Sequence, residues 1–265
     1  MIALDRTEPT ARQFAWLPPS LRTRRRFVTG AIWAATGTLL AGGVALVPPM
    51  ALSWKLLAAL GVGGGILGER VGSALVRRHV ARLARGEVSL ARVHEQTEGE
   101  VVYVRGRVRA GTEHGELQGL LHGVPGVYRR LVFRAGGTRW IHEAAVAFDV
   151  VDAHGEWIRV EPRGARLLAP VAELMDYPAS AFTGARVTPS LAAVMAGHKV
   201  DLAQPIPASE LVLRDGDEVE LVGHKSQTAD VTGHGGSFRE PPQRAVLRSG
   251  DVLPLLITPP AVAPV

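Results

Sequence analysis

The chain has 265 residues, with 30 basic and 25 acidic side chains and no cysteine. The lack of cysteine excludes disulfides, thiolate metal sites and cysteine nucleophiles. The net positive charge does not indicate a nucleic-acid-binding protein, because residues 89–265 carry 18 basic and 21 acidic groups and the positive charge is concentrated before them.

The first element in chain order is a basic tail, which is followed by the uncharged apolar segment Phe27–Val47. A helix of this length would be about 30 Å long, which matches the hydrocarbon core of a bilayer. Pro48 and Pro49 would end that helix, and a second apolar segment runs from Met50 to Gly68. The two segments together predict a transmembrane helical hairpin.

Basic residues flank both ends of this predicted hairpin, while the loop between its helices has almost no charge. Because arginine and lysine remain on the cytoplasmic side, we expect a multi-pass inner-membrane protein with both termini in the cytoplasm and anionic lipid headgroups as a partner. The predicted membrane-anchor flanks are Arg24, Arg25, Arg26, Trp54, Lys55, Arg77 and Arg78. The pair Arg24-Arg25 also resembles a twin-arginine export motif, and the sequence leaves this alternative open.

Glycines at helical spacing form the next pattern, within and just after the second apolar segment. Small residues four positions apart allow helices to approach closely in lipid, so they predict packing within the hairpin or, alternatively, a homo-oligomer contact. The predicted packing residues are Gly61, Gly64, Gly65, Gly68 and Gly72. After them, the pattern of Glu69–Arg85 predicts either a basic amphipathic helix on the membrane surface or a plain connector helix.

From Ser89 onward the pattern changes to short apolar runs separated by glycine, which is typical of strands. Residues Pro189–Gly197 predict a short helix. The predicted strands include Val101–Val108, Val127–Phe133, Trp140–Val151, Glu156–Glu161 and Glu218–Val222. The predicted fold class is therefore an N-terminal transmembrane α-hairpin plus a mostly β (α+β) cytoplasmic domain, a small barrel or sandwich, with an OB-like fold as one candidate.

These patterns give four predicted regions, taken in chain order. They are a basic cytoplasmic tail at 1–26, a two-helix transmembrane hairpin at 27–68, a basic juxtamembrane helix at 69–88, and a β domain at 89–262 with a mobile loop at 226–243.

Three segments of the β domain carry motifs in a recognisable order: Leu117–Arg129, Phe148–Ala165 and Ser209–Gly223. They resemble the patterns G-x-P-C-V-Y-Y-R, F-x-V-x-D-x-x-G with V-x-P-x-G-A, and E-x-x-L-x-x-G-D-x-V-x-x-x-G. In this order the segments resemble the beside-a-membrane domain, also called the GIDE domain, of MULAN-type mitochondrial ubiquitin ligases and many bacterial proteins. The resemblance implies a membrane-adjacent β domain with an interaction role.

The chain departs from that family in two respects. The ligases of the family carry a zinc-binding RING, which needs cysteine, whereas this sequence has none. Gly126 also stands where many relatives have cysteine. The resemblance therefore does not imply ligase activity.

Histidines are the remaining candidates for chemistry. His198, His224 and His234 surround a glycine-rich segment, but they lack the i, i+4 spacing of helical zinc ligands. No G-x-S-x-G nucleophile elbow occurs, and Asp215 and Asp217 read as turn residues. We therefore predict no catalytic, cofactor or metal site.

The expected function is that of a membrane-anchored, non-catalytic interaction or scaffold protein with an unidentified protein partner, no cofactor and no nucleic acid. One alternative is an NfeD-like accessory subunit of a membrane complex. Another is an enzyme with a histidine-based site at His198, His224 and His234.

Overall fold

The structure is a computed structural model, and it divides the chain into two compact units, residues 1–16 with 84–265 and residues 17–83. In the second unit, helical turns are described between Arg22 and Ala35, and Arg22 Nη2 donates a hydrogen bond to the Leu17 carbonyl. The residues described are 2–17, 22–23, 25, 27–32, 34–35, 87–111, 115–169, 175–177, 189–198, 200, 206–229, 243–251 and 253–259.

The transmembrane part of the predicted fold class is wrong. Among the residues that the structure describes, no helix is long and apolar enough to cross a membrane. Apart from 27–32 and 34–35, the residues of the predicted hairpin at 27–68 lie outside the described residues. The predicted multi-pass inner-membrane localisation depended on these helices and is corrected with them.

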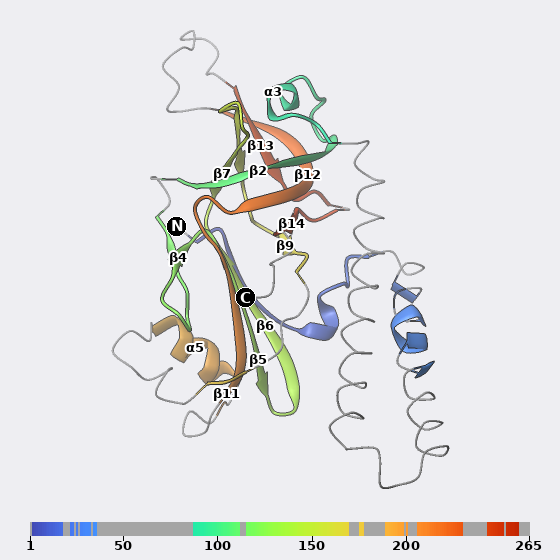
Figure 1. The fold of residues 1–265 in the computed structure, drawn as a ribbon, viewed down its shortest axis with the longest axis vertical. Helices are drawn as coiled ribbons and strands as arrows, with labels where there is room; N and C mark the ends of the chain where they lie inside the picture. Colours follow the sequence, from blue (N-terminus) through green and yellow to red (C-terminus); the bar gives the residue numbers. More distant parts are fainter. Residues whose placement is uncertain are drawn as a thin grey trace, which may run out of the picture. The chain divides into compact units, whose positions relative to one another are not determined.

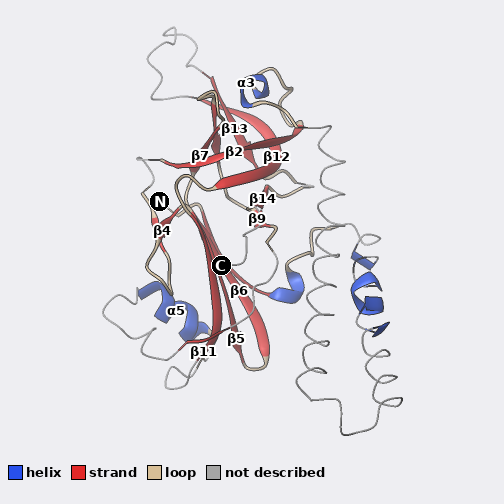
Figure 2. Cartoon of the chain, viewed as in Figure 1, coloured by secondary structure: helices blue, strands red, loops and turns tan. Residues whose placement is uncertain are grey.

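The first unit is built mainly of β-strands, in agreement with the predicted β-rich character (Figures 1 and 2). Five of its strands close into a barrel: β2 (Val101–Ala110), β7 (Phe148–Val151), β8 (Trp157–Val160), β12 (Glu218–Ala229) and β13 (Gln243–Arg248). Antiparallel pairs join β2 to β7, β7 to β8, β13 to β12 and β12 to β2, and a parallel pair joins β8 to β13. This is a Greek-key barrel of the OB type.

Alternation along β2 explains why this segment lies on a barrel. Val102, Val104 and Val108 are buried in the main core, whereas the residues between them are partly or fully exposed. Gly106 lies where β7 crosses β2, and a Cβ there would be 2.6 Å from the Val151 carbonyl oxygen. Glycine at this position therefore permits the close approach of strands that barrel closure needs.

Two short strands extend the barrel sheet beyond β12. β14 (Leu256–Thr258) pairs antiparallel with β12, and β9 (Arg166–Leu167) pairs parallel with β14. The short helix α3 (Leu90–Val93) places Leu90 and Val93 in the barrel core. The order of the strands along this sheet is β13-β8-β7-β2-β12-β14-β9.

A second sheet has the order β1-β6-β5-β11-β10. Its strands are β1 (Leu4–Pro9), β6 (Thr138–Ala145), β5 (Tyr128–Ala135), β11 (Ile206–Leu213) and β10 (Met175–Tyr177). Strands β5 and β6 form a hairpin whose two turn residues, Gly136 and Gly137, both have positive φ. That backbone is the type I′ turn, which glycine adopts without strain and which matches strand twist.

A smaller core covers one face of this second sheet. Leu191 and Met195 of α5 (Pro189–Gly197) pack there with Leu131 and Phe133 of β5. The helix lies beside the lower ends of β5 and β11 in Figure 1. The remaining elements are the hairpin of β3 (Leu117–Gln118) with β4 (Pro125–Gly126), and the 3-10 helix η1 (Thr10–Arg12).

Two predicted boundaries are also wrong. The predicted basic tail at 1–26 includes β1, whose six residues pair with β6 from Leu4 opposite Ala145 to Pro9 opposite Trp140. The predicted mobile loop at 226–243 begins inside β12, because residues 226–229 pair with β13. The partner of β1 lies more than 130 positions away in sequence, so local sequence did not indicate it, whereas β12 simply extends further toward β13 than its sequence pattern indicated.

Candidate functional site

A row of arginines lies on the outer side of the barrel. Arg105, Arg107 and Arg109 occupy alternate positions of β2, so their side chains leave the same face of the strand. Their side chains are 55, 72 and 47% exposed. The strand thus directs its valines inward and three guanidinium groups outward.

Trp157 of β8 contacts two arginines, Arg109 of this row and Arg244 of β13. The guanidinium carbon of Arg109 lies 5.2 Å from the centroid of the indole ring, and that of Arg244 lies 4.6 Å from it. Such cation–π contacts fix the plane of a guanidinium group while its N–H edges stay available as donors. We call the set Arg105, Arg107, Arg109, Trp157 and Arg244 the arginine face.

Carboxylates lie between these arginines. Glu218 of β12 is 3.1 Å from Arg105 Nη2 and 3.9 Å from Arg107 Nη2. Asp149 of β7 is 3.2 Å from both Arg109 Nη2 and Arg159 Nη1. The outer face is therefore a pattern of alternating charge in which each arginine of the β2 row has an acidic neighbour.

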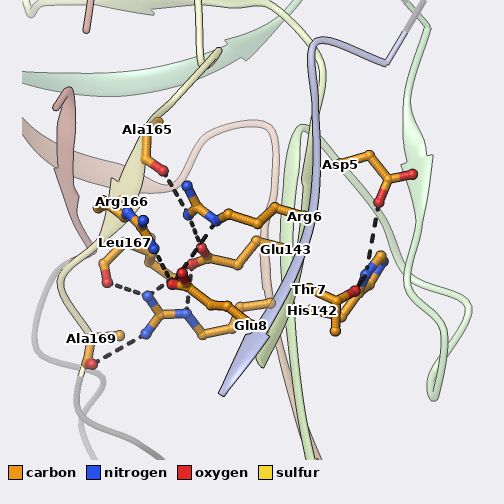
Figure 3. A network of polar contacts seen from close by, with 11 residues as sticks. Asp5, Arg6, Thr7, Glu8, His142, Glu143, Ala165, Arg166, Leu167 and Ala169 are labelled. Carbon is orange, nitrogen blue, oxygen red and sulfur yellow. Dashed lines mark hydrogen bonds and ion pairs between the residues drawn. The ribbon is translucent and has the colours of Figure 1, made fainter. Parts of the chain in front are cut away.

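A second arginine cluster is buried against the other sheet, and Figure 3 shows it from close by. Its centre is Glu143 of β6, which is 1% exposed. Glu143 accepts a 2.9 Å hydrogen bond from Arg130 Nε and also pairs with Arg6 Nη2. These three residues come from β6, β5 and β1, which are adjacent strands in the sheet.

The same arginines also bind the backbone of the segment around β9 (Figure 3). Arg6 donates to the Ala165 carbonyl at 2.9 Å, and Arg130 donates to the carbonyls of Leu167 and Ala169. Arg166 pairs with Glu8 of β1. We call Arg6, Glu8, Arg130, Glu143 and Arg166 the buried network.

The buried network binds three backbone carbonyls in and next to β9, and they lie at alternate positions, 165, 167 and 169. The intervening amides of Arg166 and Leu168 donate to Leu255 and Ile257. One edge of this segment therefore bonds to the barrel sheet and the other to arginines of the second sheet. Since buried carbonyls need donors, the network joins the two sheets.

Burial and the neighbouring arginines have opposite effects on the pKa of Glu143. Burial alone would raise the pKa of Glu143, but the charges of Arg130 and Arg6 outweigh it, so the pKa lies below its ordinary value. Burial, with Glu143 nearby, raises the pKa of Tyr128 well above the ordinary tyrosine value. Glu143 is thus held as a carboxylate between two cations, which suits a structural ion pair and not a general acid.

His142 lies beside the network on the opposite face of β6. Its Nδ1 is 2.9 Å from Thr7 Oγ1 and 3.8 Å from the Asp5 carboxylate (Figure 3). Burial, reinforced by the charge of Arg129, lowers the pKa of His142 to about 4. The imidazole is therefore neutral at physiological pH and helps to hold β1 against β6.

Most of the predicted membrane-anchor and helix-packing residues lie outside the described residues. Arg25 is described, and it lies on the helical turns of the second unit. Those outside are Arg24, Arg26, Trp54, Lys55, Arg77, Arg78, Gly61, Gly64, Gly65, Gly68 and Gly72. Their predicted roles toward lipid, and in a homo-oligomer, stay predictions.

The two described histidines of the enzyme alternative lie on different sheets. The His198 ring packs 4.1 Å from Trp140 and 5.4 Å from Phe133, on the second sheet. His224 lies in β12 of the barrel, with Nδ1 2.9 Å from the Gly99 carbonyl. His234 lies outside the described residues. Among the residues described, no three His, Asp or Glu side chains are placed to hold a metal ion.

Neither arginine cluster was predicted from the sequence, although each had a local signal. Arg130 and Glu143 are charged residues inside otherwise apolar runs, where burial without a partner is costly. Arg105, Arg107 and Arg109 alternate with apolar or small residues, which marks an exposed strand face. The pairing across strands, by contrast, had no sequence signal.

Comparison of this chain with protein-family models, with curated proteins and with solved structures found no match. The resemblance to the GIDE domain therefore stays a prediction.

Proposed function

We propose that this chain is a non-catalytic interaction protein that holds a partner on the arginine face of its barrel. The observation that carries the proposal is the row Arg105, Arg107 and Arg109 on one side of β2, next to a tryptophan already oriented by two guanidinium groups. Tryptophan and arginine are the residues most enriched at the energetic centres of protein interfaces.

The chemistry of this face suits binding better than catalysis. Guanidinium groups stay protonated throughout the physiological range, so they bind anions and do not transfer protons. The nearby carboxylates Glu218 and Asp149 are paired with these arginines. By analogy of fold alone, OB-type barrels also bind extended ligands across their outer strands.

The buried network supports the same proposal in a different way. Glu143 and Arg130, which would otherwise be candidates for acid–base chemistry or anion binding, are used to join the two sheets. That junction fixes the second sheet on the barrel, as a scaffold with one defined shape requires. The function proposed here is therefore recognition by a rigid β domain.

Affinity capture with quantitative mass spectrometry tests this proposal. Tagged wild-type protein is compared with the triple variant Arg105→Ala, Arg107→Ala, Arg109→Ala. The matched control is Arg134→Ala, Arg163→Ala, Arg214→Ala, which removes the same charge from exposed positions elsewhere. We expect a partner that wild type and control retain and that the triple variant loses at least tenfold. If all three proteins capture the same set equally, the proposal is wrong.

A further inference from the structure

We propose that the arginine face binds an extended acidic segment of a partner protein, whose carboxylates lie at alternate positions opposite Arg105, Arg107 and Arg109. This inference rests on the proposed function and adds the chemistry of the partner. Its evidence is the spacing of the arginines, the way their guanidinium groups are held, and the acidic residues between them.

Spacing is the first argument. Alternate residues of a strand such as β2 are about 6.6 Å apart, and alternate side chains of any extended peptide have the same repeat. A segment lying along β2 with an acidic residue at every second position would therefore place one carboxylate opposite each of Arg105, Arg107 and Arg109. No bend or turn in the partner is needed.

Orientation of the guanidinium groups is the second argument. Arg109 lies over Trp157 and pairs with Asp149, and Arg105 pairs with Glu218. Each contact occupies one side or one edge of a group that has five N–H donors. The remaining donors can form the paired hydrogen bonds that guanidinium makes with carboxylates, and less side-chain entropy is lost because the groups are already ordered.

The acidic residues decide between a protein segment and a nucleic acid. Glu218 lies between Arg105 and Arg107, and in the β2–β12 ladder Glu220 lies opposite Arg105. A nucleic-acid strand carries negative charge at every nucleotide and would meet these carboxylates directly. A protein segment can instead present polar or basic residues to them between its own acidic residues.

Trp157 and the net charge of residues 89–265 also favour a protein segment over a nucleic acid. Two guanidinium groups already lie over the Trp157 ring, so stacking a base on it would displace one of them. Residues 89–265 carry more acidic than basic groups, which disfavours approach of a polyanion from a distance. An acidic segment of limited length fits the local charge of the face without requiring a basic domain.

Fluorescence anisotropy with the full chain tests this inference directly. The probe is a labelled peptide of about ten residues that alternates Glu and Thr, so that it matches the length of β2. The comparison probes are a Lys-Thr peptide of the same length and a labelled oligothymidylate. We expect the Glu-Thr peptide to bind most tightly, and its binding to weaken as salt rises.

Variants that are expected to change peptide binding in opposite directions make the test specific. Arg105→Ala, Arg107→Ala, Arg109→Ala should weaken binding of the Glu-Thr peptide by roughly tenfold, since exposed charge pairs contribute little each. Glu218→Gln should strengthen it, because the variant removes a carboxylate that competes for Arg105 and Arg107. The control Arg134→Ala, Arg163→Ala, Arg214→Ala should leave it unchanged. Circular dichroism of each variant confirms that it is folded.

Two outcomes would overturn the inference: tighter binding of oligothymidylate than of the Glu-Thr peptide, or equal binding of that peptide by wild type and the β2 triple variant. Either result could occur while affinity capture still shows a partner that depends on the β2 arginines. In that case the proposed function would stand and only the acidic-segment partner would be wrong.

Discussion

The buried network and the arginine face use the same pairing of arginine with carboxylate under opposite conditions. In the network, the side chains of Arg130 and Glu143 are 3% and 2% exposed, whereas on the face Arg107 and Glu218 are 72% and 45% exposed. Water screens the exposed pairs, so each contributes little to stability. Within the buried network, removing one partner leaves a charge that solvent cannot compensate.

Burial, and not residue type, therefore decides what an arginine does in this molecule. Arg6 and Arg130 are committed to Glu143 and to the β9 carbonyls, so they hold the two sheets together. Under the proposed function, Arg105 and Arg109 would exchange their carboxylates for those of a partner at low cost. On that proposal, stability and recognition depend on different regions of the molecule.

The largest expected effect comes from removing the carboxylate at the centre of the network. Glu143→Gln leaves Arg6 and Arg130 without their shared counter-charge, and we expect the free energy of unfolding to fall by about 3–5 kcal/mol. Urea denaturation followed by circular dichroism measures this change.

The matched control for that experiment is Glu161→Gln, because Glu161 is exposed and follows β8. We expect this control to change the free energy of unfolding by no more than about 0.5 kcal/mol. A loss below about 1 kcal/mol for Glu143→Gln would contradict a stabilising role for the buried network.

An intermediate effect is expected from His142 as pH falls. Its pKa is about 4 in the folded chain and 6.5 in the unfolded chain, so the unfolded state takes up the proton first. The stability contributed by neutral His142 is complete above pH 6.5 and is lost progressively toward pH 4. Between pH 7 and pH 5 the expected loss is about 2 kcal/mol.

Urea denaturation at several pH values, carried out with His142→Asn and with wild type, measures this dependence. The variant should be less stable at pH 7 but should lose less stability between pH 7 and pH 5. His154→Asn is the control, since His154 is exposed in the turn between β7 and β8. Equal slopes for wild type and His142→Asn would show that this histidine is not protonated on unfolding.

The smallest effect is expected at the arginine face. A double-mutant cycle of Arg105→Ala and Glu218→Gln should give a small coupling energy, which falls further in high salt because both side chains are exposed. Thermal denaturation of the four proteins at low and high salt measures it. A large coupling energy that salt does not reduce would place this pair with the buried network and against a role in partner exchange.

Sequence reasoning succeeded where structure is set by local pattern. The predicted strand Val101–Val108 lies within β2, and the predicted helix Pro189–Gly197 coincides with α5. It failed at Leu4–Pro9, because that segment shows no clear alternation and becomes a strand only through β6. The prediction of a transmembrane hairpin relied on hydropathy, length, the Pro48-Pro49 break and the flanking basic residues, and the described residues contain no helix that meets the requirement.

Local pattern was enough to predict that residues from 89 onward are rich in strands, because alternating apolar residues and glycine turns act over a few positions. The contact of Arg6 and Arg130 with Glu143 depends on the fold, since the three residues lie on three strands and Arg6 is 137 positions from Glu143. The charge of an arginine is fixed by its chemistry, but its burial, and hence its role, depends on which distant segments cover it.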